Sequence, residues 1–284
     1  IVGMLLARSE PVEYVGIAVL AGALIQFAWL FLLAMRNGAA YDHSDCAPRT
    51  IDWNIVSGFI TGTGPVAGWV LLTAIVPLFE RSLLSTSAEG AVAGLNYTDK
   101  LINLPLGIVS ISLASAVFPS LSAAPPLERR RIVRRAFWLL GALLVPIMLV
   151  MTGGAEATTA VVYKRGRFDA SAAMLTASLL RAYGWALFPV SVTMLLNRLC
   201  FAEGKFRLPF MVGLIGVTVQ VGLDYALVGR MGPVGVGWGA VGSSSLQVLC
   251  LVAALLHNRE AREEVLPLLL PLGFWGAVTI AGVA

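Results

Sequence analysis

Long apolar stretches recur along this chain at a length that suits a membrane-spanning helix. Hydrophobic residues make up 58% of the 284 residues and charged residues only 13%, whereas an ordinary soluble domain has about 25% charged residues. The apolar windows are about 20 residues long, far longer than the roughly 9 to 11 residues of an outer-membrane strand. Each window is expected to be an α-helix, because a helix satisfies its own backbone hydrogen bonds in lipid.

The predicted fold is therefore all-α: a polytopic membrane helical bundle with about eight transmembrane helices. A short apolar stub at residues 1–7 precedes them. The expected spans are residues 14–35, 54–79, 92–121, 137–152, 171–197, 208–229, 234–256 and 265–284. These spans predict a multi-pass membrane protein.

Two polar loops divide the chain into three predicted regions. Residues 1–36 would end a preceding lobe, residues 51–257 would form a six-helix lobe, and residues 264–284 would begin a C-terminal helix pair. Six spans are a common size for one half of a two-repeat transporter. Because the chain lacks an initiator Met and both its ends are apolar, we expect a fragment of a longer membrane protein that lacks most of its N-terminal lobe.

Basic residues are unevenly distributed between the two sets of alternating loops. One set holds twelve Lys and Arg residues, including the run Arg129–Arg131, and the other holds six. The positive-inside rule places the richer set in the cytoplasm. The net charge of +4 is thus expected to anchor the protein in the bilayer, and no nucleic-acid partner is expected.

A stripe of polar residues runs through the apolar span 92–121. Asn96, Lys100 and Asn103 lie at i, i+4 and i+7, which is one face of a helix. A Lys at the centre of a membrane helix costs roughly 2.5 to 3.5 kcal/mol even on lenient scales, so Lys100 must face protein or water. The stripe predicts a hydrated cavity that binds an anionic group; a structural ion pair between helices is the alternative. Asp99 points about 100° away from Lys100 and would reach other partners.

Other polar residues inside the spans allow two interpretations each. Arg181 could face the same cavity or extend to the outer surface. Gln220 and Asp224, at i and i+4, could couple transport to a proton or cation, or could simply hold helices together by hydrogen bonds. Pro105 and Gly107 could form a hinge or an ordinary kink.

The charged pair Glu80 and Arg81 is expected at the outer headgroup boundary. Residues 155–168 predict a short helix in the headgroup layer, and Asp169 is a suitable N-cap for the next helix. No catalytic triad, metal-ligand cluster or acidic pair for magnesium is evident, so neither an enzyme nor a metal or cofactor site is expected.

Three separate motifs resemble those of a known family. Leu95–Leu101, Leu104–Gly107 and Phe118–Ser122 together resemble the seventh-to-eighth-helix signature of the MurJ/MviN lipid II flippases, roughly L-x-Y-A-D-R-L-x-x-L-P-x-G followed by L-P-x-L-S. Tyr163–Asp169 is similar to the family's y-x-x-G-x-F-d, and Arg198–Pro209 to its r-a-F-Y-A-x-g-d-t-x-x-P.

The resemblance covers about residues 1–256 and implies a transporter of the multidrug/oligosaccharidyl-lipid/polysaccharide exporter superfamily. Such a protein has two six-helix lobes and two extra C-terminal helices. The implied function is to flip lipid II, or a similar undecaprenyl-diphosphate-linked glycan, across the bacterial cytoplasmic membrane by alternating access for cell-wall synthesis. The alternatives are an exporter of another polyprenyl-linked glycan or a small cation, and a non-transporting membrane scaffold.

The resemblance also implies roles for the polar stripe. Asp99 and Lys100 occupy the family's D-R pair, although Lys lacks the bidentate fork of Arg. We expect Lys100 to neutralise the diphosphate, and Asn96 and Asn103 to hydrogen-bond the head group.

Overall fold

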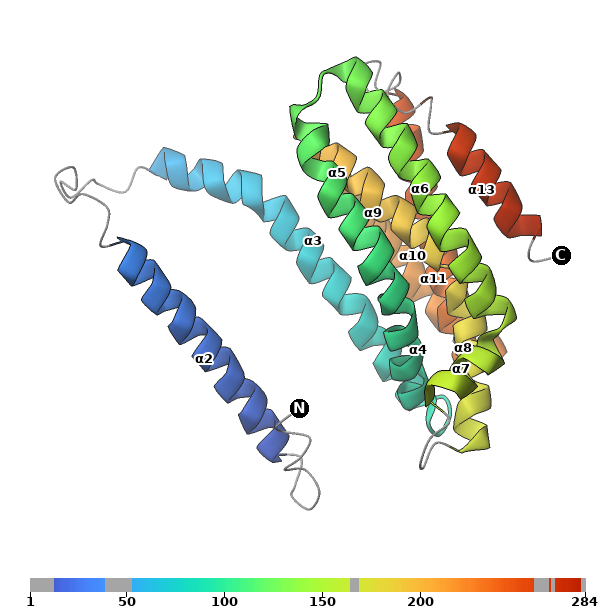
Figure 1. The fold of residues 1–284 in the computed structure, drawn as a ribbon. Helices are drawn as coiled ribbons and strands as arrows, with labels where there is room; N and C mark the ends of the chain where they lie inside the picture. The colour runs from blue at the N-terminus through green and yellow to red at the C-terminus, as the bar shows by residue number, and fades with distance from the viewer. Residues whose placement is uncertain (1–12, 39–52, 164–168, 258–265, 267–268, 282–284) are drawn as a thin grey trace. The chain divides into compact units, whose positions relative to one another are not determined.

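The computed structural model describes residues 13–38, 53–163, 169–257, 266 and 269–281 (Figure 1). By contacts the chain separates into two compact units, residues 1–57 and 58–284. The described residues contain helices and no strands, which confirms the all-α prediction. The predicted division into three regions stays a prediction.

The α-helices begin and end as follows: α2 Glu13–Gly38, α3 Trp53–Ser85, α4 Ala91–Pro105, α5 Ser112–Ala123, α6 Pro126–Gly153, α7 Ala155–Tyr163, α8 Ala170–Gly184, α9 Leu187–Ala202, α10 Arg207–Met231, α11 Gly235–His257 and α13 Leu269–Ala281. A π-helical segment, η2 (Leu106–Ile111), joins α4 to α5, and a 3₁₀ turn, η3 (Gly232–Val234), joins α10 to α11.

Within the described residues, every predicted apolar window coincides with helix, but some helix ends differ from the prediction. The predicted stub at residues 1–7 lies outside the described residues. Helix α6 begins at Pro126 rather than near residue 137, because the arginine run is itself helical and Pro126 suits the first helical turn. The window 171–197 is two helices, α8 and α9, bent by 45°. The predicted N-cap is confirmed: Asp169 accepts the Ala172 backbone N–H at 2.8 Å, and this bond lowers the pKa of its carboxyl.

Several of these helices can cross a bilayer by length and composition. Three continuous helical stretches among the described residues qualify, at 91–121, 128–153 and 207–257, and the bent α8–α9 pair makes a fourth. The stretch 207–257 contains both α10 and α11, which pack against each other. The chain is thus a multi-pass membrane protein.

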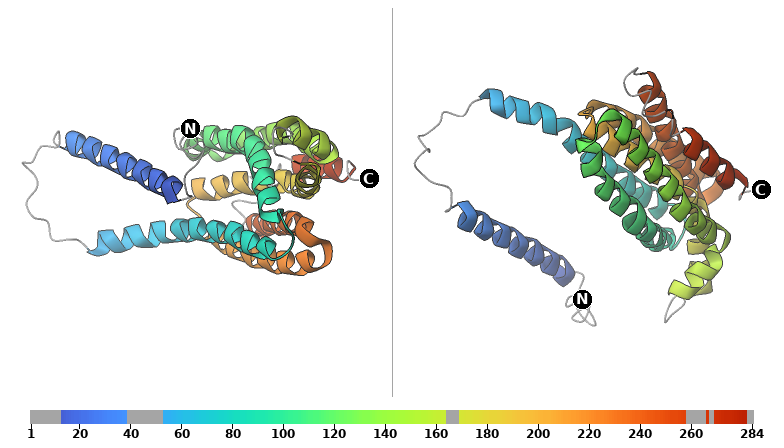
Figure 2. Two further views of the ribbon diagram at one scale, coloured as in Figure 1. Left: turned by 90° about the horizontal axis from the view of Figure 1, so that it is seen from below. Right: turned by 45° about the horizontal axis from the view of Figure 1, so that its top comes forward.

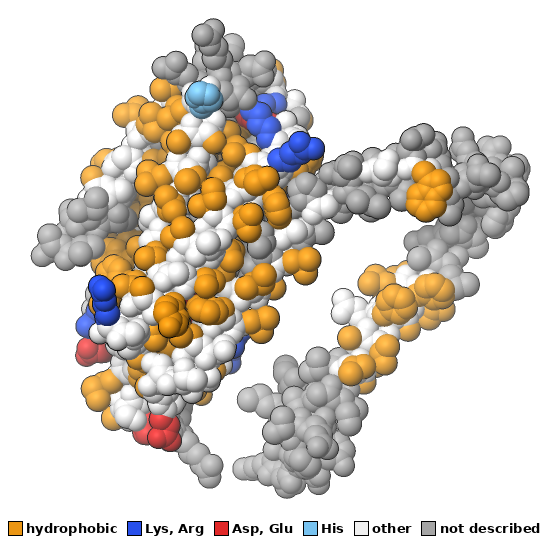
Figure 3. Space-filling model, turned by 180° about the vertical axis from the view of Figure 1, so that it is seen from behind, with side chains coloured by type: hydrophobic (Ala, Val, Ile, Leu, Met, Phe, Trp, Pro, Cys, Tyr) orange, Lys and Arg blue, Asp and Glu red, His pale blue; other side chains and the backbone are white. Residues whose placement is uncertain are grey.

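The outer surface of the unit 58–284 suits contact with lipid. Ile108, Val150 and Leu249 are each at least 65% exposed. Figure 3 shows one face on which hydrophobic side chains dominate the middle, while Lys, Arg, Asp and Glu lie mostly towards its two ends. This is the distribution expected when hydrocarbon surrounds the middle of a helical bundle.

Helix α8 lies in the interior of this unit, where it contacts α4, α6, α7 and α11. Its residues Leu179 and Leu180 are fully buried. Gly237 of α11 allows an especially close approach: a Cβ there would lie 2.6 Å from Ala182 Cβ and 2.9 Å from the Tyr183 backbone nitrogen. Small residues at such crossings are how membrane helices reach close packing.

This contact predicts a stability difference between two glycine substitutions. Gly237→Ala should destabilise the purified protein by about 1–3 kcal/mol, because the α8 backbone cannot move aside. A Cβ atom at Gly222 of α10 would have no neighbour within 4 Å. Gly222→Ala should therefore be neutral or stabilising by up to about 1 kcal/mol. Thermal unfolding in detergent measures both; equal melting temperatures for the two variants would contradict the close α8–α11 contact.

Candidate functional site

A cavity of about 960 Å³ lies among α3, α4, η2, α9, α10 and α11 within the unit 58–284. Most of its wall is apolar. Its charged and amide side chains are Glu80, Arg81, Asp99, Asn103, Asn197, Arg198, Gln220 and Gln247. The cavity therefore offers both signs of charge inside the unit 58–284 of a membrane-spanning protein.

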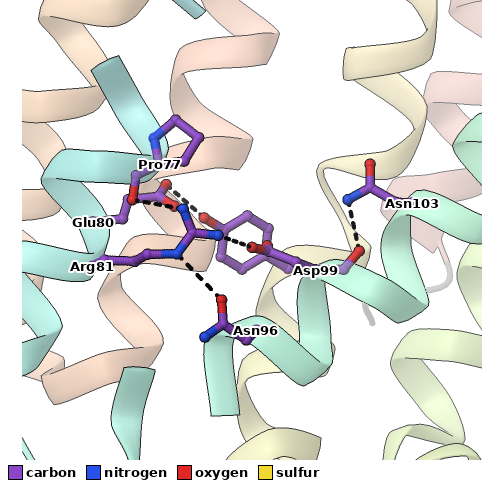
Figure 4. A network of polar contacts seen from close by, with 7 residues as sticks. Pro77, Glu80, Arg81, Asn96, Asp99 and Asn103 are labelled. Carbon is purple, nitrogen blue, oxygen red and sulfur yellow. Dashed lines mark hydrogen bonds and ion pairs between the residues drawn. The ribbon is translucent and has the colours of Figure 1, made fainter. Parts of the chain in front are cut away.

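Arg81 is the centre of one polar network in this cavity. From α3 its Nε donates to Asn96 Oδ1 at 3.2 Å, and its Nη2 lies 3.6 Å from Asp99 Oδ2. Figure 4 shows Arg81 reaching towards both α4 residues, with Glu80 beside it on α3. These two contacts hold the guanidinium in place. Because the Arg81 side chain is 41% exposed, the group remains accessible from the cavity.

Glu80 is the centre of a second network. It is only 4% exposed, and its Oε1 accepts hydrogen bonds from Tyr183 Oη at 2.6 Å and Gln220 Nε2 at 2.9 Å. Ser243 Oγ of α11 in turn donates to Gln220 Oε1 at 3.0 Å. Glu80 therefore faces protein and is not an exposed anchor, while its predicted position at the headgroup boundary stays a prediction.

Asp224 lies one helical turn from Gln220 and is fully buried. Among the described residues, neither of its carboxyl oxygens has a hydrogen-bond partner. Its Oδ1 points at Gly239 of α11, where any Cβ would collide with it. A buried, unpaired carboxylate is costly, so such a group normally carries a proton or a bound cation.

The structure divides the predicted site residues into three groups. Asp99, Asn103 and Gln220 line the cavity, and Asn96 joins it through Arg81. Asn103 Nδ2 also donates to the Asp99 backbone oxygen at 2.8 Å.

Lys100 and Arg181 are not among the lining residues. Lys100 is exposed on α4, and its Nζ lies 5.9 Å from the centroid of the Tyr97 ring. Arg181 is also exposed and pairs with Glu156 of α7 at 3.1 Å. Arg81, not Lys100, is thus the basic residue beside Asp99 in this cavity.

The predicted hinge residues lie where the helix changes type. Pro105 is the last residue of α4, and Gly107 lies in the π-helical segment that follows. Proline has no N–H to donate, which disturbs the regular hydrogen-bond ladder, and π segments occur frequently at functional sites. Ser110 of this segment is buried and lies 2.7 Å from Ser191 Oγ of α9, so η2 is fixed to its neighbour.

The part of the cavity wall supplied by α9 carries residues that the sequence did not single out as site residues. Asn197 is 6% exposed, and its Oδ1 has no hydrogen-bond partner among the described residues. The Arg198 guanidinium lies 5.7 Å from the centroid of the Phe118 ring. Arg198 was noted only as part of a motif, and Asn197 has no sequence signal that separates it from a helix-packing residue.

The comparisons with known proteins agree on one family. The model of the family "Lipid II flippase MurJ" matches residues 1–270. Relatives named "Probable lipid II flippase MurJ" include one from Bdellovibrio bacteriovorus, 28% identical over 72% of this chain and 37% of its own length. Another, from Synechocystis, is 28% identical over 77% of this chain and 41% of its own length.

A solved structure shows the same fold. It is titled "Lipid II flippase MurJ, inward closed conformation" and is 17% identical, with a TM-score of 0.65, over 84% of this chain and 55% of its own length. The chain spans about two fifths of the length of the relatives from Bdellovibrio bacteriovorus and Synechocystis.

Proposed function

Because the chain belongs to the lipid II flippase MurJ family, whose model matches residues 1–270, we propose that it takes part in flipping lipid II across the bacterial cytoplasmic membrane. The chain would supply the second lobe of an alternating-access transporter for cell-wall synthesis. A first lobe, which residues 1–36 are predicted to end, would complete the substrate path. The observation that carries this proposal is the charged cavity of about 960 Å³ inside an apolar helical lobe.

The chemistry of the cavity suits a lipid-linked diphosphate. Such a substrate combines an anionic diphosphate with a large polar head and an apolar tail. Arg81 offers a planar guanidinium that can bind phosphate oxygens in pairs, and Asp99 at 3.6 Å orients it without covering it. The amide groups of Asn103 and Asn197 line the same space and can hydrogen-bond sugar hydroxyls or peptide groups.

Lys100 is proposed to contact the substrate from the exposed surface of α4. Lys100 and Asn103 are both exposed on the surface of the unit 58–284, where a neighbouring lobe could face them. This α4 surface would form one wall of a cavity between lobes, with Lys100 supplying a positive charge to the substrate. The family's D-R pair occupies the equivalent positions of the motif, which supports a role for Asp99 and Lys100.

We propose that the helix breaks provide the movement. Pro105 and Gly107 interrupt α4–α5 next to the cavity, and α8 and α9 meet at a 45° bend. Irregular backbone at membrane depth is tolerated where it is buried in protein or lines a cavity. Rocking of one lobe against the other would use such points.

We also propose that the Asp224 region couples transport to a proton or a monovalent cation. Glu80, Gln220 and Ser243 bring oxygen atoms from α3, α10 and α11 to one side of the cavity, and Asp224 lies one helical turn from Gln220 on α10. Asp224 has unused acceptor capacity, and Gln220, one turn away on the same helix, donates to Glu80 at the cavity wall. Oxygen-rich sites of this kind bind hard cations.

Genetic rescue tests the transport proposal. Expressed from its complete open reading frame, the protein should restore growth and outward exposure of lipid II in bacteria depleted of their own flippase. Lys100→Ala should abolish rescue, whereas Lys100→Arg should retain it because the positive charge is kept. The exposed Arg230→Ala serves as a matched loss of one charge and should still rescue.

Two results would contradict parts of this account. If the intact protein inserts correctly and accumulates but does not rescue, the substrate is another lipid-linked glycan. If Lys100→Ala rescues as well as the unaltered protein, Lys100 does not bind substrate.

A thermal-stability experiment tests the coupling proposal. Asp224→Asn should abolish rescue and yet leave the melting temperature unchanged or raised, because a neutral amide costs less to bury than an unpaired carboxylate. If the site holds a cation, Na⁺ should raise the melting temperature of the unaltered protein by mass action and leave that of Asp224→Asn unchanged. If it holds a proton, lowering the pH should instead raise the melting temperature of the unaltered protein and leave that of Asp224→Asn unchanged.

The control is Glu89→Gln, which removes an exposed carboxylate and should respond to Na⁺ and pH like the unaltered protein. Full rescue by Asp224→Asn would contradict the proposed role of Asp224 in coupling. So would equal Na⁺ and pH responses of the unaltered protein and Asp224→Asn.

A further inference from the structure

A second pocket, of about 550 Å³, lies away from the cavity, between α6 and α13. It is lined by Arg134, Arg135, Trp138, Leu270 and Phe274. The two helices are in contact and lie side by side in the views of the fold (Figures 1 and 2). The pocket combines two positive charges with exposed apolar side chains.

The arginines at the start of α6 are not equivalent. Arg129 is used in the fold: its Nε donates to the Leu121 backbone oxygen at 3.1 Å and its Nη2 to the Ala124 backbone oxygen at 3.4 Å. Arg134 and Arg135 are exposed and make no hydrogen bond or ion pair with the part of the chain that the structure describes. Their charges are therefore available to a ligand.

Aromatic side chains of α6 and α13 also line this pocket, next to the two arginines. The ring centroids of Trp138 and Phe274 lie 5.2 Å apart, and those of Trp138 and Trp275 lie 5.8 Å apart. Leu270, one turn before Phe274 on α13, is 73% exposed.

The order of these residues along α6 matches the layers of a bilayer leaflet. From Pro126, at 1.5 Å per residue, Arg134 and Arg135 lie about 12–14 Å along the helix, and Trp138 about 5 Å further. Basic residues contact lipid phosphates, tryptophans occupy the interface below them, and apolar side chains meet the acyl chains. The positive-inside assignment puts this end of α6 on the cytoplasmic side, where anionic lipids attract basic segments.

We propose that this pocket binds one anionic phospholipid from the cytoplasmic leaflet. Arg134 and Arg135 hold its phosphate, Trp138 and Phe274 contact the glycerol and the first part of the acyl chains, and Leu270 packs beside them. The lipid bridges α6 and α13, so it fixes α13 to the lobe. This is a structural lipid site, separate from the cavity proposed for transport.

Lipid retention tests this proposal. The full-length protein is incorporated into nanodiscs of phosphatidylglycerol and phosphatidylcholine, and the lipids that remain bound are counted by native mass spectrometry as competing detergent is added. Phosphatidylglycerol should be retained preferentially. Because two positive charges beside the lipid phosphate are lost, Arg134→Gln with Arg135→Gln should lower its apparent affinity by about ten-fold or more.

A matched control removes two other exposed arginines from the same predicted side, by Arg131→Gln with Arg207→Gln, and should retain the lipid. Arg134→Lys with Arg135→Lys should retain most of it, since the charge remains. Inorganic phosphate at millimolar concentration should not displace the lipid, because the aromatic and apolar contacts require acyl chains.

Three results would overturn the proposal. Equal retention of phosphatidylglycerol and phosphatidylcholine would show that the arginines do not select an anionic lipid. An equal loss in the control pair would show a general charge effect. Displacement by inorganic phosphate alone would identify a phosphate site. A helix content unchanged by circular dichroism confirms that the variants are folded and makes each of these results interpretable.

Discussion

Two carboxyl groups buried in an apolar helical lobe constrain the rest of this structure. Neither Glu80 nor Asp224 could remain in a lipid-facing position, so the protein must enclose both carboxyl groups. Helix α11 packs against α10 and α8, and side chains of α8 and α10 reach Glu80 of α3. The Tyr183 hydroxyl and the Gln220 amide satisfy Glu80 at 2.6 and 2.9 Å, and the close α8–α11 approach at Gly237 brings Tyr183 to that position. Asp224 lacks such donors among the described residues. A lobe built only for stability would gain by replacing Asp224 with an apolar residue.

We assign different roles to the two polar networks: one binds the substrate and the other binds a cation or proton. Arg81 and the α4 residues provide an accessible positive charge beside hydrogen-bonding amides, which suits an anionic head group. Glu80, Gln220, Ser243 and Asp224 provide oxygen atoms that are screened from lipid, which suits a small cation or proton. Both networks use α3, so movement of this helix would affect both, and this shared helix is a physical route for coupling them.

Much of the fold was predictable from the sequence, because hydrophobic length alone decides where a helix can cross a bilayer. The windows near residues 54–79 and 208–229, for example, correspond to α3 and α10. The division of the window 171–197 into α8 and α9 was not predicted, since the apolar composition continues through residues 184–187. The extension of α6 to Pro126 was also missed, because hydropathy does not register a charged but helical segment.

The candidate site was predicted less completely. Asp99, Asn103 and Gln220 were found because polar residues inside apolar spans are rare. Lys100 attracted attention for the same reason, yet the basic residues that line the cavity are Arg81 and Arg198. The signal for Arg81 and Glu80 was present, as a charged pair at the end of a long apolar window. Whether such a pair meets headgroups or protein depends on how far the helix continues and what packs beside it, which are tertiary facts.

We propose that the cavity binds lipid II through Arg81 and allows it to cross the membrane. The most direct measurement is lipid II translocation in proteoliposomes containing the full-length protein, with Arg81→Gln compared with the exposed, matched Arg230→Gln. We expect translocation by the unaltered protein and by Arg230→Gln, and at least about a ten-fold loss for Arg81→Gln, since a hydrogen bond to a charged group is worth about 1.5–3 kcal/mol. Translocation by Arg81→Gln at the unaltered rate would contradict this proposal.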